Sequence, residues 1–139
     1  MSATTIHGDM RAASRARLLS IAGLPDQQWE GRDYSATKGT PYVSESFRPI
    51  ASDVRATGVG GTIAHSMNSS FTLHYPSNAG TLAIEAMAGA IMEAFRPGTA
   101  LSYSTSSGVV LKAERGPLLQ EPDWINCSIT INIVAYTSN

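Results

Sequence analysis

Hydrophobic and polar residues alternate along the C-terminal stretch of the chain, which predicts a long β-strand over residues 124–137. Every second side chain from Ile125 to Ala135 is apolar and would face a hydrophobic core. The residues between them would face outward, and none is charged: Asn126, Ser128, Thr130, Asn132 and Val134. A largely polar outer face without charge indicates a surface that contacts protein as well as water.

The remaining pattern predicts two helices and several further strands. A spacing of three and four between apolar residues favours helices over residues 4–22 and 79–95. Alternation favours strands over residues 28–30, 41–49, 69–75, 101–103 and 109–114, with residues 116–123 as a turn region. The order α-β-β-β-α-β-β-β predicts an α+β fold, as one domain over residues 1–139. Its single antiparallel-rich (mixed) β-sheet would have two α-helices packed on one face.

The second predicted helix is apolar on nearly every side. Ile84, Met87, Ile91 and Phe95 mark one buried stripe. Most other positions hold small residues, namely Ala83, Ala86, Ala88, Gly89, Ala90 and Ala94. We expect this helix to be buried on more than one side, with Ser77 or Asn78 as its N-cap.

Residues 52–68 contain Gly58, Gly60 and Gly61 and predict a long, mobile hairpin or loop. Prolines bracket the preceding strand at Pro41 and Pro49, which indicates an edge strand or a strand that stops abruptly. Long connections of this kind are usually functional or disordered, so the segment is a candidate contact with another protein.

Charge is scarce in this chain, and the deficit is local. Charged residues make up 15% of the sequence, against about 25% in a typical soluble domain. No aspartate, glutamate, lysine or arginine occurs between Arg55 and Glu85. The formal net charge of −1 offers no basic surplus for binding nucleic acid. Either the deficit is a compositional accident, or part of the surface is covered by protein.

The single cysteine, Cys127, excludes an intrachain disulfide. It lies on the apolar side of the last predicted strand, where a buried and inert thiol is expected. The polar N-terminus lacks the apolar stretch of a secretory signal. No apolar run approaches the roughly 20 residues that a membrane-spanning helix needs. We therefore expect a protein made in the cytoplasm, without a membrane partner.

No group of residues has the spacing of a catalytic or metal site. His7, His65 and His74 have neither metal-site spacing nor accompanying cysteines or carboxylates, so each is interpreted as a surface or loop histidine. No serine lies in a nucleophile-elbow pattern, and no P-loop lysine follows the glycines at 58–61. We expect no catalytic residue, no cofactor and no metal.

Two groups of charged side chains have ordinary explanations. Arg11, Arg15 and Arg17 form a small basic group, which is expected to be a solvated helix face. Two carboxylate pairs could form by chance, but nothing in the sequence places them in a cleft: Glu30 with Asp33, and Glu114 with Glu121.

Four short motifs follow one another along nearly the whole chain. They are Gly23-Leu24-Pro25 with Trp29-Glu30, Gly39-Thr40-Pro41-Tyr42-Val43, Phe71-Thr72-Leu73-His74-Tyr75-Pro76 with Phe95-Arg96-Pro97-Gly98-Thr99, and Gly108-Val109-Val110 with Trp124. Their order and spacing resemble the tail-terminator-like family of phage proteins, which is related to the tail terminators of long, non-contractile-tailed phages.

The resemblance implies a structural protein of the virion and not an enzyme. Tail terminators form a hexameric ring on the head-proximal end of the tail tube, stop tube polymerisation and join the tail to head completion proteins. The implied partners are other copies of the chain, the tail tube protein and a head completion or stopper protein. DNA would pass through the lumen without specific binding. The implied location is the virion tail or neck, after assembly in the host cytoplasm.

A ring also accounts for uncharged surfaces, because neighbouring subunits cover each other's flanks. Candidate interface residues come from the glycine-rich segment, the small-residue helix and the outer face of the last strand: Arg55, Val59, Ile63, His65, Met67, Gly89, Asn126, Ser128, Thr130 and Asn132.

Two alternatives stay open at this point. One is another neck component of the virion, such as a head–tail stopper, which would bind the portal side instead of capping tail tubes. The other is a small host α+β binding domain or enzyme, which would need a concave pocket with convergent polar groups.

Overall fold

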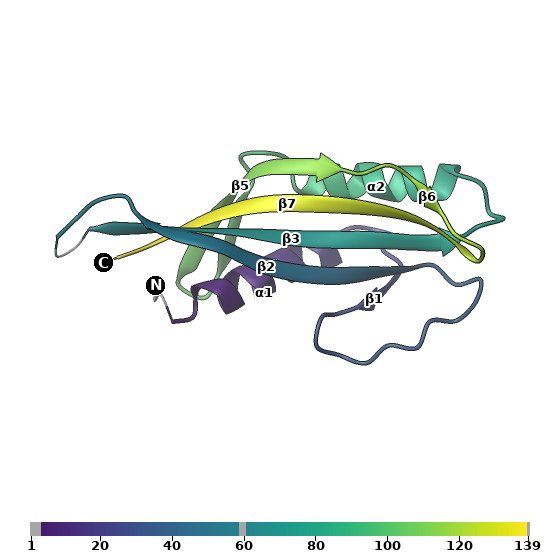
Figure 1. Ribbon diagram of the computed structural model, residues 1–139, viewed down its shortest axis with the longest axis horizontal. Helices are drawn as coiled ribbons and strands as arrows, with labels where there is room; N and C mark the ends of the chain where they lie inside the picture. The colour runs from purple at the N-terminus through teal and green to yellow at the C-terminus, as the bar shows by residue number, and fades with distance from the viewer. Residues whose placement is uncertain (1–3, 59–60, 139) are drawn as a thin grey trace.

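The computed structural model describes residues 4–58 and 61–138, which form one curled, mixed β-sheet with two helices on one face (Figure 1). The elements are α1 (Ile6–Leu19), β1 (Asp26–Gln28), β2 (Tyr42–Val54), β3 (Thr62–Pro76), α2 (Leu82–Ala94), β4 (Ala100–Tyr103), β5 (Ser106–Arg115), β6 (Leu119–Gln120) and β7 (Trp124–Ser138). The predicted α+β fold and element order are confirmed, with the short strand β6 added inside the predicted turn region.

The sheet has the strand order β1-β2-β3-β7-β5-β4, and β6 also pairs with β7. β1 runs parallel to β2, and the other pairings within the described residues are antiparallel. β3 and β7 lie at the centre, paired from Thr62 opposite Ser138 to Pro76 opposite Trp124 without a register shift. The odd-numbered side chains of both strands therefore face one side of the sheet, and the even-numbered ones face the other.

The hydrophobic core lies between the odd-numbered side of the sheet and the helices. As predicted, Ile129, Ile131 and Ile133 on β7 are fully buried, and Cys127 is buried beside them. The same layer receives large side chains from β3 and from both helices: Met67, Phe71, Leu73, Ile6, Met10, Leu18, Ile84 and Ile91. Each contributes about 1.5–3 kcal/mol to stability by leaving water.

Helix α1 packs closely against the sheet because Gly108 on β5 has no side chain. A Cβ atom at this position would lie 2.8 Å from the Sδ atom of Met10 and 2.9 Å from the carbonyl oxygen of Val134. Both distances are shorter than van der Waals contact, so a larger residue at Gly108 would push α1 away from the sheet.

Residues 52–68 belong to an extended hairpin, so of the two predicted alternatives the hairpin is confirmed and the long loop is wrong. β2 continues to Val54 and β3 begins at Thr62. β7 stays paired with β3 up to Ser138 opposite Thr62, and the hairpin extends past the helices (Figure 1). Pro49 does not end β2, because the register shifts between Pro49 and Ala51 and pairing then resumes. β1 pairs only with the first residues of β2, up to Ser44, so Pro49 lies on an open edge that needs no backbone donor.

Helix α2 begins later than the sequence predicts. Its N-cap is Thr81 and not Ser77 or Asn78, and no side-chain hydrogen bond caps it. Gly80 has a φ of 78°, a left-handed conformation that keeps the preceding turn out of the helix.

The expectation that α2 is buried on more than one side is wrong for the single chain. Ile84 and Ile91 are fully buried against the sheet. Ala86 and Gly89, on another side of the helix, are exposed. The apolar composition of α2 thus leaves an uncharged helical surface facing outward.

Two arginines of α1 bind the sheet, so their interpretation as a solvated basic face is wrong. Arg15 donates hydrogen bonds from Nη2 and Nε to the buried carboxylate of Glu45 on β2, at 2.5 Å and 2.8 Å. These bonds raise the pKa of Arg15 above its usual value. Arg11 pairs with Glu30 at 2.6 Å, and its guanidinium lies 4.8 Å from the centre of the Phe47 ring. This cluster holds α1 against the edge of the sheet that β1 and β2 form.

Replacing Glu45 with glutamine should lower the free energy of unfolding by about 2–3 kcal/mol, because the variant leaves the guanidinium of Arg15 without a charged partner. Urea denaturation followed by circular dichroism measures this change. Glu114→Gln is the matched control, since Glu114 pairs with Lys112 in water and should change stability by less than about 1 kcal/mol. Equal effects of the two substitutions would contradict the assigned role of Glu45.

Candidate functional site

The even-numbered side of the central strands, opposite the helices, carries small polar residues without charge. β2 continues this surface, because its register places Ser44 and Ser46 opposite Thr72 and Ser70. We name this surface the polar face and define it by the side chains of Ser44, Ser46, Asn68, Ser70, Thr72, Ser128, Thr130 and Asn132. The charge-free sequence after Arg55 thus supplies the middle of an open sheet surface.

Side chains of the polar face form hydrogen bonds with one another across the strands. Three pairs join β3 to β7: Ser70 with Thr130 at 3.2 Å, Thr72 with Ser128 at 3.0 Å, and Asn132 with Asn68 at 3.0 Å. A polar group that already has a protein partner loses less when water is removed than a group that depends on water. The polar face can therefore be covered by protein at a low cost in free energy.

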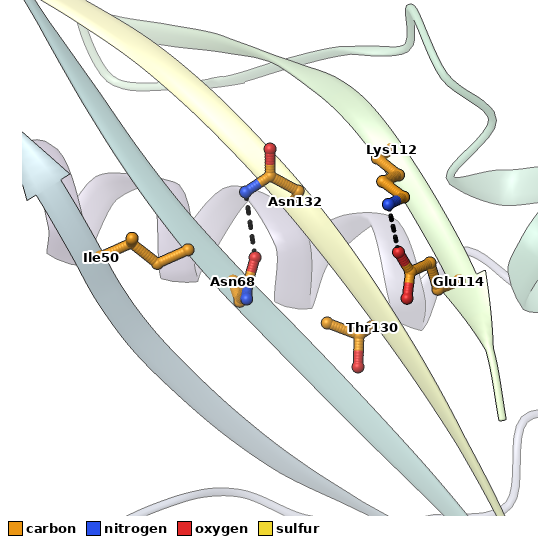
Figure 2. Close-up of a pocket in the computed structure, with 6 residues that line it drawn as sticks. All are labelled: Ile50, Asn68, Lys112, Glu114, Thr130 and Asn132. Carbon is orange, nitrogen blue, oxygen red and sulfur yellow. Dashed lines mark hydrogen bonds and ion pairs between the residues drawn. The ribbon is translucent and has the colours of Figure 1, made fainter.

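A hollow of about 290 Å³ lies on this side of the sheet, where Figure 2 shows the helix behind the strands. Its lining residues are Ile50, Asn68, Lys112, Glu114, Thr130 and Asn132. Lys112 and Glu114, both on β5, form an ion pair with each other, so the two charges at its edge are neutralised within the chain. Ile50 is 49% exposed and gives the hollow an apolar wall.

Aromatic rings gather at the end of the polar face remote from the hairpin. Tyr42 stacks on His74 with 4.2 Å between ring centres and meets Trp124 edge-on at 5.3 Å. His74 has a partner on each ring nitrogen, Ser44 at 3.0 Å and Asn126 at 2.7 Å. Burial lowers the pKa of His74, which favours the neutral ring in this cluster. The interpretation of His74 as a plain surface or loop histidine is therefore corrected.

His65 joins three strands at the base of the projecting hairpin. Its Nδ1 atom lies 2.7 Å from the Ser52 hydroxyl on β2, and its Nε2 atom lies 2.8 Å from the Thr137 hydroxyl on β7. Burial lowers the pKa of His65, and the nearby ring of His7 lowers it further. The ring is almost fully buried, so His65 is also not a surface or loop histidine.

The exposed side of α2 forms a second uncharged surface, which we name the helix face and define by Leu82, Ala83, Ala86 and Gly89. Leu82 is 83% exposed, although leucine side chains are usually withdrawn from water. A Cβ atom added to Gly89 would meet no atom within 4 Å, so no packing within the chain requires glycine there.

The structure separates the predicted interface residues into different regions. Ser128, Thr130 and Asn132 lie together on the polar face. Asn126, at its aromatic end, is corrected to a buried position, where it contacts His74 and Glu121. Gly89 lies on the helix face, and Arg55 and Ile63 lie on the hairpin.

Two further predicted interface residues are corrected to interior positions, and another lies outside the described residues. Met67 is fully buried in the core because it is an odd-numbered residue of β3. His65 is buried in the hydrogen-bonded group at the hairpin base, so neither side chain is available at the surface of this chain. Val59 is the residue that falls outside the described part of the chain.

Sequence reasoning missed several residues of these surfaces: Ser44, Ser46, Asn68, Ser70, Thr72, Ile50 and Leu82. The alternation along residues 69–75 was a usable signal for Ser70 and Thr72, since it continues the pattern of the last strand. Nothing in the sequence indicated that Ile50 and Leu82 would be exposed.

In the part of the chain that the structure describes, no group of three or more histidine, cysteine, aspartate or glutamate side chains could hold a metal ion. Among the same residues, neither helix is long and apolar enough to cross a membrane. Two of the carboxylates that the sequence offered as chance pairs form ion pairs with basic residues instead. Glu114 pairs with Lys112, and Glu30 pairs with Arg11.

Comparisons with known proteins agree with this architecture. The family model described as phage tail terminator protein matches residues 9–133. One solved structure, which carries no functional description, has a TM-score of 0.71 at 14% identity and covers 97% of this chain and 96% of that chain. A chain from the virion of a native gene transfer agent particle has a TM-score of 0.57 at 20% identity, covering 96% of this chain and 98% of that chain. A search of curated protein sequences gave no match. At these identities the two structural matches support the fold alone.

Stability should fall in mild acid because His65 is buried with a lowered pKa. The unfolded chain binds a proton near pH 6.5 and the folded chain binds it at lower pH, so this contribution is complete above pH 6.5 and is lost as the pH falls. Urea denaturation at several values from about pH 8 to about pH 5 should show a shallower loss for His65→Gln than for the wild type. The pKa of His74 is also lowered, so the His65→Gln variant should still lose some stability as the pH falls. Superimposable pH profiles would contradict the role assigned to His65.

Gly89→Ala should raise the free energy of unfolding of the isolated chain by about 0.5–1 kcal/mol, because alanine favours helix and no neighbouring atom obstructs its Cβ. Thermal or urea denaturation measures the change. Gly108→Ala is the matched control and should destabilise the chain, since its Cβ would collide with Met10. A destabilised Gly89→Ala variant would show that an unseen contact requires glycine at this position.

Proposed function

Because the chain belongs to the phage tail terminator protein family, we propose that it forms a ring that caps the head-proximal end of a phage tail tube. The observation that carries the proposal is the family match over residues 9–133, which includes most of α1, all of α2 and nearly the whole sheet. The chain is thus a structural protein of a phage tail. The hexameric stoichiometry, the arrest of tube polymerisation and the junction to head completion proteins belong to the proposal.

The uncharged surfaces support self-association. A ring of identical subunits requires each copy to present two surfaces to its neighbours. The polar face and the helix face supply two such surfaces, and charged residues are depleted at the centres of protein interfaces. A structural role, with no reaction catalysed, is also consistent with the hydroxyl-bounded environment of His65, which lacks a carboxylate partner.

The β2–β3 hairpin is the proposed contact with the tail tube or with the next ring. Residues 48–58 are exposed along its outer strand, and the hairpin extends past the body of the domain (Figure 1). Arg55 lies near its described end and offers a charge that an axial partner can bind. The buried group around His65 fixes the base of the hairpin, so that its direction is set before the partner binds.

The nearly neutral chain suits a ring whose lumen passes DNA. A net charge of −1 and the absence of a lysine-rich stripe would avoid the phosphate attraction that basic surfaces create. The proposed location is the tail or neck of the virion, after assembly in the host cytoplasm.

Purified protein added to growing tail tubes of the cognate phage should stop their elongation and leave a ring at one end of each tube. Electron microscopy with mass measurement tests both parts, and the expected ring contains six copies, as the family resemblance implies. Tubes grown without the protein are the control. Rings that bind the portal side of the neck and leave tube growth unchanged would instead favour a stopper-like role, and a monomer that never engages tubes would contradict the proposal.

A further inference from the structure

We propose that the seam between neighbouring subunits joins the polar face of one copy to the helix face of the next, with Leu82 seated in the hollow beside Asn132. This inference rests on the proposed ring and names the surfaces that would build it. The occupant of the polar face is therefore a second copy of this chain.

The first argument is that the polar face is already prepared to lose water. Its hydroxyl and amide groups pair across β3 and β7, so covering them leaves few polar groups without a partner. No charged side chain lies among the residues that define it. The charges at its border are Arg48, which lies opposite Asn68 on β2, and the ion pair of Lys112 with Glu114. An uncharged centre with charges at the border is the usual arrangement of a protein interface.

The second argument is that the helix face has features that the isolated chain does not explain. Leu82 stands almost fully in water, and Gly89 weakens the helix without any packing reason within the chain. Small residues at Ala86 and Gly89 allow a flat surface to approach α2 closely, while Leu82 projects beyond them. A projecting leucine on one surface and a hollow with an apolar wall on the other are complementary in shape.

The third argument concerns the charges beside the helix face. Glu85 pairs with Arg115 within the chain, and Glu93 pairs with Arg96 at 3.4 Å. A neighbour placed on α2 would therefore bury no charge that lacks a partner, which is the main electrostatic penalty at an interface.

The fourth argument concerns symmetry. The helices cover one side of the sheet, and the polar face is the other side, so the two surfaces point in different directions. A contact between unlike surfaces repeats from copy to copy and closes into a ring when the rotation permits.

Strand addition at the open edge of β2 is a less suitable seam. The backbone N–H of Phe47 on that edge already donates to the Glu30 carboxylate at 3.1 Å, and Pro49 has no N–H to donate. Edges protected in this way resist pairing with another chain. The faces of the domain, and not this edge, are therefore the surfaces available to a neighbour.

The test uses two full-length variants, each of which blocks one surface. Leu82→Asp places a charge on the helix face, and Ser70→Arg places one at the centre of the polar face, where Ser46 and Thr130 lie opposite and offer no carboxylate. Each variant alone should be a folded monomer, with association at least about 100-fold weaker than that of the wild type, because a charge would be buried without a partner. Leu19→Lys is the matched control on an exposed leucine of α1 and should form rings. The aspartate of Leu82→Asp lies at the start of α2, and the lysine of Leu19→Lys lies at the end of α1. The helix dipole favours each of these charges, so both variants should keep the fold.

Mixing the two variants gives the decisive result. The Leu82→Asp copy keeps an intact polar face and the Ser70→Arg copy keeps an intact helix face, so the mixture should form heterodimers with one seam each and no rings. Light scattering after size-exclusion chromatography measures the masses, and circular dichroism confirms folding. Rings formed by either variant alone, or a mixture that stays monomeric, would overturn the proposed seam while leaving the ring itself in place. A wild-type chain that stays monomeric both in solution and at the ends of tail tubes would instead contradict the proposed function.

Discussion

The pairing of β3 with β7 is the interaction on which the rest of the structure depends. The two strands keep one register along their whole length, so odd-numbered residues of one strand lie beside odd-numbered residues of the other. The odd-numbered residues become a continuous apolar layer that both helices cover, and the even-numbered residues become a continuous polar surface. A shift of one residue in either strand would place isoleucines in water and serines in the core. The core and the candidate interface are thus two consequences of a single register.

Polar residues in this chain serve two different physical purposes. The buried carboxylate of Glu45 and the ring of His65 fix elements within the chain, since each is withdrawn from water and has hydrogen-bond partners on another element. The residues of the polar face remain accessible, yet they too are paired across strands. A water-exposed surface does not need such pairing, whereas a surface that will be covered does, because dehydration of unpaired hydroxyls is costly.

The histidines with lowered pKa values are held within the sheet. A catalytic site concentrates groups with shifted pKa values in a cleft, where a substrate can reach them. Here His65 and His74 have a hydrogen-bond partner on each ring nitrogen and hold strands together. The residues that define the polar face and the helix face are uncharged. Membership of the phage tail terminator family agrees with this division between a rigid interior and neutral flanks.

The sequence by itself determined the strands, the helices and the charge-free outer surface of β7, because local periodicity of two or of three to four residues depends only on neighbouring positions. It also indicated the burial of Ile131 and Cys127. Only the tertiary structure decided which strands lie beside β7, since register between distant segments is not written in either segment alone. That pairing withdrew Met67 and His65 from the surface, extended β2 past Pro49 and brought Arg15 to Glu45. It also left Leu82 in water, because exposure depends on what the rest of the fold covers.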